Sequence, residues 1–195
     1  MTLVRIVLFL CFSAVLGADP RVIESKVTSE NRTGKTWTTI SGQVEALTDL
    51  SIEEVAAVIT DWSAYPKLFS RIRAASTRTD GQDVLLTETT LVSALGISVT
   101  NRFTLRLRKE QSPTSLTYSW TQEWTDGSID GLEGSWRLET LGMGKEQTKV
   151  TYATRSSVPQ TFLGQDGVLA VFFPGELKDI VKIVLVEAKK KKERT

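Results

Sequence analysis

Between residues 71 and 156, six successive segments have the pattern of strands, and hydrophobic and polar side chains alternate with a period of two most clearly over residues 97–109 and 114–124. Short turns separate the segments, and Asp80-Gly81 is a strong signal for a tight hairpin. Because successive side chains of a strand point to opposite faces, this period predicts strands. They are expected over residues 71–79, 82–91, 97–109, 114–124, 132–140 and 147–156. Six strands joined by short turns predict an antiparallel meander with one polar face toward water.

The other face of this meander is rich in aromatic side chains and carries two amides. The third segment would place there Ile97, Val99, Asn101, Phe103, Leu105 and Leu107. The fourth segment adds Leu116, Tyr118, Trp120, Gln122 and Trp124, and the last two add Gly134, Trp136, Leu138, Val150, Tyr152 and Thr154. A face of this composition has to be covered by another element.

Segments on either side of the meander supply further elements. Residues 36–46 alternate as a strand, and Ser51 with Glu54 forms a capping box that predicts a helix over 51–60. Pro66 fits the first turn of a second short helix over 63–69. From Pro174-Gly175 the spacing becomes helical, and one side of this C-terminal helix carries Leu177, Ile180, Val181, Val184, Leu185 and Ala188. This helix is the expected cover of the aromatic face.

The start of the chain has the layout of a secretory signal. Residues 6–16 are uncharged and nearly all apolar; Arg5 precedes them and the small pair Gly17-Ala18 follows. The pattern predicts a signal over residues 1–18, cleaved near Ala18, and export to the periplasm or out of the cell. The alternative is an uncleaved membrane anchor, for which the run is short, since spanning takes about 20 apolar residues. Residues 19–35 are polar and are expected to form a flexible lead-in or an edge element.

Composition excludes several classes of function. The chain has 195 residues, 41% hydrophobic and 24% charged, with a net charge of +1, which suits one globular domain and offers no field for nucleic acid. It has no histidine, and its one cysteine, Cys11, lies in the apolar run, so histidine-dependent nucleophiles and histidine or cysteine metal sites are excluded. The carboxylates Glu123 and Asp130 remain for acid–base work, although alternation turns Glu123 away from the aromatic face. No catalytic residue, metal or cofactor is assigned, and a monomer is expected.

Four local motifs accompany this order of elements: Ile52-Glu53-Glu54-Val55 followed by Asp61-Trp62 and Tyr65-Pro66, then Gly134-Ser135-Trp136-Arg137-Leu138, Thr148-Lys149-Val150-Thr151-Tyr152 and Val158-Pro159. With them the chain resembles the START-like (SRPBCC) superfamily, and within it the polyketide cyclase/dehydrase and coenzyme-Q-binding START-type group. The resemblance covers residues 36–192 and leaves 193–195 as a basic tail. It implies the α+β helix-grip fold, a curved antiparallel sheet of about seven strands gripping the C-terminal helix.

The resemblance also implies a cavity between sheet and helix, which members of the superfamily use for lipids, sterols, quinones, polyketides or plant hormones. We therefore expect an exported carrier or binding protein for a hydrophobic small molecule. One alternative is a cyclase or hydratase that uses a carboxylate or one of the tyrosines Tyr118 and Tyr152 in the same cavity. A second alternative is an interaction module without a ligand.

The expected cavity lining joins the inner face of the sheet to the helix: Asn101, Phe103, Tyr118, Trp120, Gln122, Trp136, Tyr152, Phe172, Leu177, Ile180, Val181 and Val184. A buried amide without a partner costs about 1–3 kcal/mol, so Asn101 and Gln122 each need backbone, water or ligand as a partner. For the aromatic residues the alternative is plain core packing. Lys189, Lys190, Lys191 and Lys192 are either a solvated helix end or a contact with an anionic membrane surface.

Overall fold

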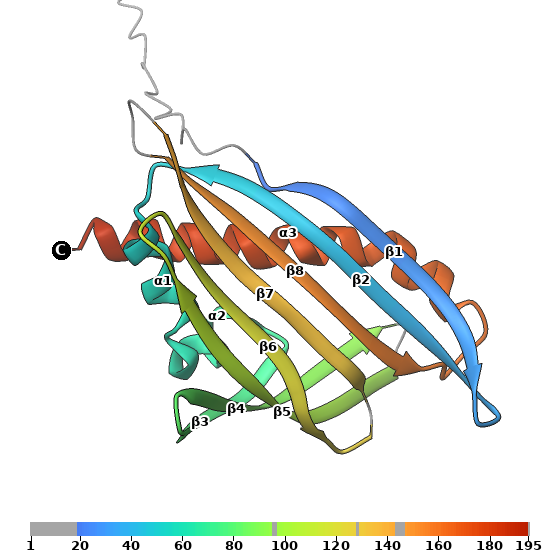
Figure 1. Cartoon of the computed structure of the whole chain (residues 1–195). Coiled ribbons are helices and arrows are strands. Elements are labelled where there is room, and N and C mark those ends of the chain that lie inside the picture. Colours follow the sequence, from blue (N-terminus) through green and yellow to red (C-terminus); the bar gives the residue numbers. More distant parts are fainter. Residues whose placement is uncertain (1–18, 95–96, 128, 143–146, 195) are drawn as a thin grey trace, which may run out of the picture.

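An eight-stranded antiparallel sheet with three α-helices forms the protein (Figure 1). The computed structural model describes residues 19–94, 97–127, 129–142 and 147–194; the predicted signal over residues 1–18 lies outside them. The strand order is β1-β2-β8-β7-β6-β5-β4-β3, so β3 to β8 form a meander whose last strand, β8, lies beside β2. The strands are β1 Arg21–Arg32, β2 Lys35–Thr48, β3 Ile72–Asp80, β4 Asp83–Ala94, β5 Ile97–Gln111, β6 Ser115–Thr125, β7 Asp130–Leu141 and β8 Gln147–Pro159.

Two short helices and a 3-10 turn connect β2 to β3, as the capping box and Pro66 predict. They are α1 Ile52–Ile59, η1 Trp62–Ala64 and α2 Tyr65–Leu68. The Ser51 hydroxyl accepts from the backbone N–H of Glu54 at 3.2 Å, and the Glu54 carboxylate accepts from the N–H of Ser51 at 2.8 Å. Two of the free backbone donors at the start of α1 are thus satisfied, which fixes where the helix begins.

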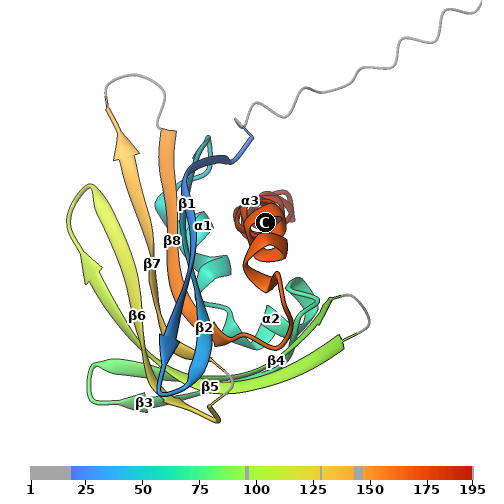
Figure 2. The ribbon, with the colours of Figure 1, turned by 90° about the vertical axis from the view of Figure 1, so that its right-hand side faces the viewer.

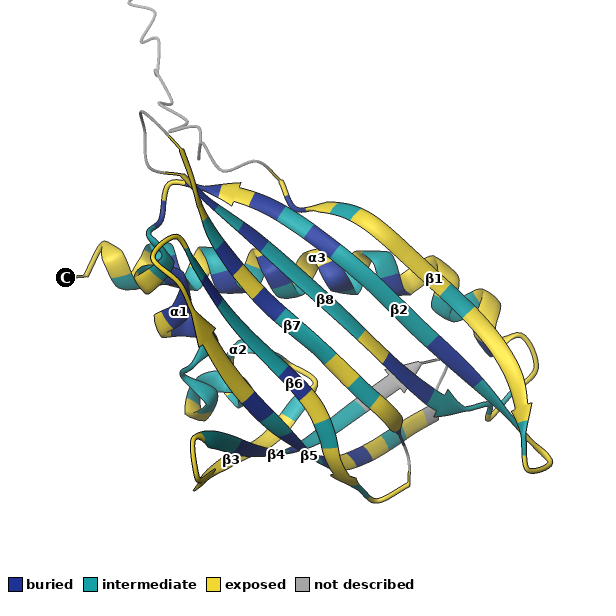
Figure 3. Ribbon diagram, viewed as in Figure 1, coloured by how far each residue is buried: buried dark blue, intermediate teal, exposed yellow. Residues whose placement is uncertain are grey.

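The long helix α3, Gln165–Lys192, covers the concave face of the sheet. Figure 2 looks along this helix and shows β1, β2 and β6–β8 on one side of it, with β3–β5 turning beneath. Its main contacts are with β1, β2 and α1. The side chains that face the sheet are fully buried: Leu177, Val181, Val184 and Ala188. Burial alternates most clearly along β5, as the sequence pattern predicts (Figure 3).

The predicted start of α3 at Pro174-Gly175 is wrong, because the helix begins earlier, at Gln165. The buried Gln165 side chain holds this beginning: it accepts from the N–H of Thr161 at 2.8 Å and donates to the carbonyl of Pro159 at 3.2 Å. Pro174 lies inside the helix and lacks the N–H that would bond back to the preceding turn. Buried Phe173 and Leu177 on either side pack on the sheet, which stabilises the helix through the proline.

The sheet also has one strand more than expected. Residues 21–32 form β1, the edge strand, which pairs with β2 from Arg21↔Glu45 to Arg32↔Lys35. The edge element is therefore the correct alternative for this segment, and a separate flexible lead-in is wrong. Polar side chains suit this strand because its outer edge meets water.

A bulge in β6 reverses the predicted orientation of Trp124. Opposite β5 the register passes from Leu105↔Gln122 directly to Thr104↔Trp124, so Glu123 is an extra residue. The Arg106 guanidinium binds both Glu123 carboxylate oxygens at 3.0 Å on the outer face. Beyond the bulge Trp124 shares the outer face with Thr104 and is 49% exposed.

None of the helices in the described part of the chain is both long and apolar enough to span a membrane.

Replacing Gly42 by alanine should destabilise the fold. A methyl group at this position would overlap Leu177 Cδ1 and approach Phe173 Cε1 to 3.1 Å, so α3 would have to shift. Overpacking of this kind costs about 1–3 kcal/mol in the free energy of unfolding, which urea denaturation measures. Gly167→Ala is the control, because nothing lies within 4 Å of its added methyl group. An unchanged midpoint for Gly42→Ala would contradict this packing.

Candidate functional site

The aromatic side chains of three neighbouring strands form one cluster on the inner face. In the register, Tyr118, Trp136 and Tyr152 stand side by side on β6, β7 and β8. The ring centroids of Trp136 and Tyr152 are 4.5 Å apart, and those of Trp120 and Tyr152 are 5.8 Å apart. Trp120 lies over Gly134, where a side chain would overlap its ring. The missing side chain at Gly134 therefore lets the indole of Trp120 lie flat on the sheet.

Glu88 is a buried carboxylic acid on the same inner face. It lies on β4 directly opposite buried Phe103 of β5 and is only 7% exposed. It makes no hydrogen bond or ion pair with any residue that the structure describes. Burial raises the pKa of Glu88 from an ordinary 4.5 to about 7, since the charged form loses water and gains no cation.

Asn101 lies next to this acid. Thr90 of β4 pairs directly with Asn101 of β5, one inward position along from the Glu88↔Phe103 pair. The Asn101 side-chain nitrogen donates to the Thr90 hydroxyl at 3.4 Å, and the Asn101 Oδ1 atom is buried without a hydrogen bond. We call Glu88, Thr90 and Asn101 the polar corner; it holds two acceptors that lack donors.

Two tyrosines approach the polar corner from other elements. The negative charge of Glu88 contributes to the raised pKa of Tyr65, from α2, and of Tyr152, from β8, although burial is the main cause for both. The pKa of Tyr152 rises to about 12. The Tyr65 hydroxyl donates to the carbonyl of Ile59 at 2.6 Å, and its ring meets Phe69 edge to face. At neutral pH both are neutral phenols, so neither supplies a charge that pairs with Glu88.

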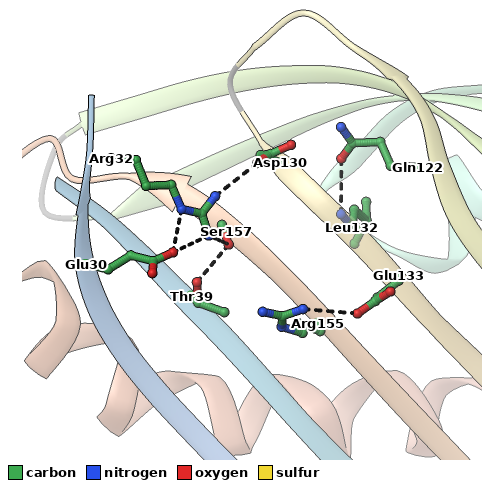
Figure 4. A network of polar contacts seen from close by, with 9 residues as sticks. All are labelled: Glu30, Arg32, Thr39, Gln122, Asp130, Leu132, Glu133, Arg155 and Ser157. Carbon is green, nitrogen blue, oxygen red and sulfur yellow. Dashed lines mark hydrogen bonds and ion pairs between the residues drawn. The ribbon is translucent and has the colours of Figure 1, made fainter. Parts of the chain in front are cut away.

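The remaining predicted lining residues divide by burial. Those in the packed core are Phe103, Trp120, Trp136, Leu177, Val181 and Val184. The half-buried ones are Tyr118, Gln122, Tyr152 and Ile180. Gln122 has a structural partner, because its side-chain oxygen accepts from the N–H of Leu132 at 3.1 Å (Figure 4). The prediction for Phe172 is wrong: it is 64% exposed, whereas the next residue, Phe173, turns inward.

Charged groups outside the inner face are engaged with one another. Arg32 of β1 donates to Asp130 at 3.0 Å and to Ser157 at 3.3 Å, and it also pairs with Glu30 (Figure 4). The Arg106 guanidinium lowers the pKa of Glu123 below its usual range. The two carboxylates considered for acid–base work, Glu123 and Asp130, are thus held in ion pairs away from the polar corner.

The basic end of α3 contacts acidic residues of the protein itself. Lys191 Nζ donates to Asp61 Oδ2 at 2.9 Å, and Lys192 lies 3.2 Å from the Glu54 carboxylate. Lys190 lies 3.8 Å from Glu187 on the same helix. The pairs of Lys191 with Asp61 and of Lys192 with Glu54 connect the end of α3 to the start of η1 and to α1. Contact of this segment with an anionic membrane stays a prediction.

A shallow depression of about 270 Å³ lies on the opposite face of the sheet, around Ser41, Gln43, Glu133 and Arg155. Its floor includes Gly42 and Gly134, whose inner sides are filled by Leu177 and Trp120. The depression therefore opens away from α3. Its lining is polar and contains none of the predicted site residues.

The sequence did not predict that Glu88 faces inward, because hydrophobic and polar residues do not alternate cleanly along β4. Val84, Leu85 and Leu86 are consecutive apolar residues, and Leu85 is buried on the outer face between Arg78 and Arg106. No face could be assigned to this segment from its period alone. Pairing with the clear alternation of β5 identifies the inward set as Val84, Leu86, Glu88 and Thr90.

Within the described residues, no group of three or more histidine, cysteine, aspartate or glutamate side chains is placed to hold a metal ion.

Comparison with known proteins gives a fold. No family profile matches the chain, and no curated protein matches it in sequence. A STAR-related lipid transfer protein from Xanthomonas axonopodis aligns with a TM-score of 0.62 at 11% identity, over 85% of this chain and 98% of that one. Human STARD10 aligns with a TM-score of 0.59 at 9% identity, over 87% of this chain and 76% of that one. The Zhui aromatase/cyclase from Streptomyces aligns with a TM-score of 0.55 at 17% identity, over 78% and 95%.

The chain therefore has the START-like, helix-grip fold: a curved antiparallel sheet closed by a long C-terminal helix. Structures that share this fold include a STAR-related lipid transfer protein and an aromatase/cyclase.

Stability should fall as pH rises through the window set by Glu88. The folded protein keeps the Glu88 proton up to a pKa of about 7, whereas the unfolded chain releases it near the ordinary 4.5. The folded state thus binds more protons between these values, so the free energy of unfolding decreases there, by up to about 3 kcal/mol. Glu88→Gln should remove this decrease in urea denaturation between pH about 5 and about 8.

The control for this titration is Glu110→Gln, because Glu110 is exposed on β5. It should keep the wild-type dependence on pH. Parallel curves for wild type and Glu88→Gln would show that Glu88 titrates near its ordinary value.

Proposed function

We propose that this protein is an exported carrier that holds a hydrophobic small molecule between the inner face of the sheet and α3. One observation carries the proposal: a half-buried aromatic surface adjoins a buried carboxyl group and a buried amide oxygen that have no partners among the residues that the structure describes. Ligand sites of this kind are mostly apolar, with few polar groups to fix orientation.

Burial along the inner face supports this position. Tyr118, Gln122 and Tyr152 retain accessible surface although they face α3. The helix α3 has its main contacts with β1, β2 and α1. Strands β1 and β2 lie at one end of the strand order, whereas β4 and β5 lie toward the other end. A small apolar molecule would bury the aromatic surface that α3 leaves accessible, at a gain of about 25 cal/mol per Å² of apolar area.

The structural neighbours agree with this class of ligand. They include a STAR-related lipid transfer protein and an aromatase/cyclase. Export is supported only by the apolar run of residues 6–16. Quinone-like, polyketide-like and lipid-like molecules are the candidate ligands.

A cyclase or hydratase is the second candidate, and Glu88 is the observation that favours it. A carboxyl group with a pKa near 7 is half protonated at neutral pH, which suits it to act as a general acid or base. Of the two tyrosines considered for this chemistry, Tyr118 and Tyr152, only the pKa of Tyr152 is raised in part by the charge of Glu88; burial is the main cause of that shift. Recovery of the bound molecule after incubation distinguishes the two functions: a carrier returns it unchanged, and an enzyme returns a product.

Filling the inner face at Thr90 should abolish binding. Thr90→Phe adds a ring next to Glu88 and Asn101, whereas Thr89→Phe adds the same ring one position along, on the outer face. Fluorescence of the neutral dye Nile red should rise with wild type and Thr89→Phe and stay low with Thr90→Phe. We expect a loss of at least about tenfold in affinity, equivalent to about 1.4 kcal/mol.

Native mass spectrometry of gently purified protein is the second measurement. Wild type should carry an added mass that organic extraction removes. Equal dye binding by the two phenylalanine variants, together with no added mass on the wild type, would refute the proposed function.

A further inference from the structure

We propose that the polar corner selects ligands whose polar end donates hydrogen bonds, an ammonium or hydroxyl group, and rejects those that end in a carboxylate or phosphate. This inference rests on the proposed function and names the chemical class of its ligand. The head group would lie between the Glu88 carboxyl group and Asn101 Oδ1, and the apolar part would lie along Tyr152 and Trp120.

Strand register brings the two acceptors to one place. Thr90 and Asn101 are direct partners, and Glu88 is the next inward residue of β4. Glu88 and Asn101 are therefore diagonal neighbours on one face, about 7–8 Å apart at the backbone, within reach of one small head group. The bond from Asn101 to Thr90 uses the amide nitrogen, so the amide oxygen is the atom left for a ligand.

The corner offers acceptors and lacks cations. A carboxylate and an amide oxygen both accept hydrogen bonds. The raised pKa of Glu88 has burial as its cause, with no contribution from a lysine or arginine. Arginine side chains of β5 lie on the outer face, where Arg106 binds Asp80, Asp83 and Glu123. An anionic head group would thus meet a carboxylate without any compensating charge.

Both residues are more than nine-tenths buried, and neither Asn101 Oδ1 nor the Glu88 carboxyl group has a hydrogen-bond partner among the described residues. A hydrogen-bond donor on the ligand would replace the hydrogen bonds with water that these acceptors lose on burial. An ammonium group would replace the most of them, because it supplies several donors and a positive charge opposite Glu88. A hydroxyl group supplies one donor and binds either protonation state of Glu88.

Three amphiphiles with the same chain separate these head groups: tetradecylamine, tetradecanol and tetradecanoate. Each displaces Nile red from the full-length protein at pH about 8, where Glu88 is ionised. The amine and the alcohol should displace the dye at concentrations at least about tenfold lower than the carboxylate, with the amine lowest. Equal or better displacement by the carboxylate would overturn the inference.

Two variants assign the preference to the polar corner. Glu88→Gln should raise the concentration of amine needed by about tenfold and change the alcohol little, because the charge is lost and an acceptor remains. Asn101→Leu should weaken the alcohol, and it should stabilise the free protein in urea, because it removes a buried acceptor without a donor. Glu110→Gln on the exposed side of β5 is the control and should retain the wild-type order.

An unchanged order of the three amphiphiles in both variants would refute the role of these residues even if the wild type prefers donors. A different result would refute the proposed function itself. In that case Nile red would not bind to the wild type, so no displacement by any amphiphile could be measured.

Discussion

The contact between α3 and β2 at Gly42 determines how the rest of the structure is arranged. Leu177 occupies the space that a side chain at this position would need, and Phe173 closes in beside it. The helix therefore lies close to β1 and β2, at one end of the strand order, and its last turn is held by Asp61 and Glu54. Strands β4 to β6 curve past the helix rather than under its most buried residues. The inner face of these strands is where the polar groups without partners are found.

Two buried acceptors in this region oppose folding. A buried carboxyl group and a buried amide oxygen without donors each reduce stability, and apolar residues of similar size would fit a core of leucine, valine and tryptophan. Such local losses concentrate at functional sites, because the rest of the fold has stability enough to hold them. The aromatic cluster around Trp136 and Tyr152 lies on the neighbouring strands, and a packed aromatic pair stabilises a fold by about 0.5–1.5 kcal/mol beyond its burial. The two acceptors that reduce stability and the aromatic cluster that adds to it thus lie on adjacent parts of the inner face.

Most of the fold is predictable from the sequence, because most of its strands have an apolar inner face and a polar outer face. The first helix, α1, also begins with a capping box that the sequence shows. Predictions fail where a tertiary contact overrides the local pattern. Pro174 marks a helix start by itself, yet the buried Gln165 side chain and the packing of Phe173 carry α3 through it. Three consecutive apolar residues in β4 conceal which face Glu88 occupies. Asn101 is recognisable because it interrupts a regular series, and the sequence identifies it as a group in need of a partner.

The bulge at Glu123 changes which residues of β6 face inward, and no local sequence pattern predicts this change. Before it, the even-numbered residues Tyr118, Trp120 and Gln122 point toward α3; after it, the odd-numbered Thr125 takes that direction. The bulge therefore changes which residues of the strand face inward. It sets the far border of the aromatic surface at Gln122 and directs Trp124 to solvent. The ion pair of Arg106 with Glu123 lies on the outer face at this same residue, so the apolar face ends where the outer face carries a charged contact.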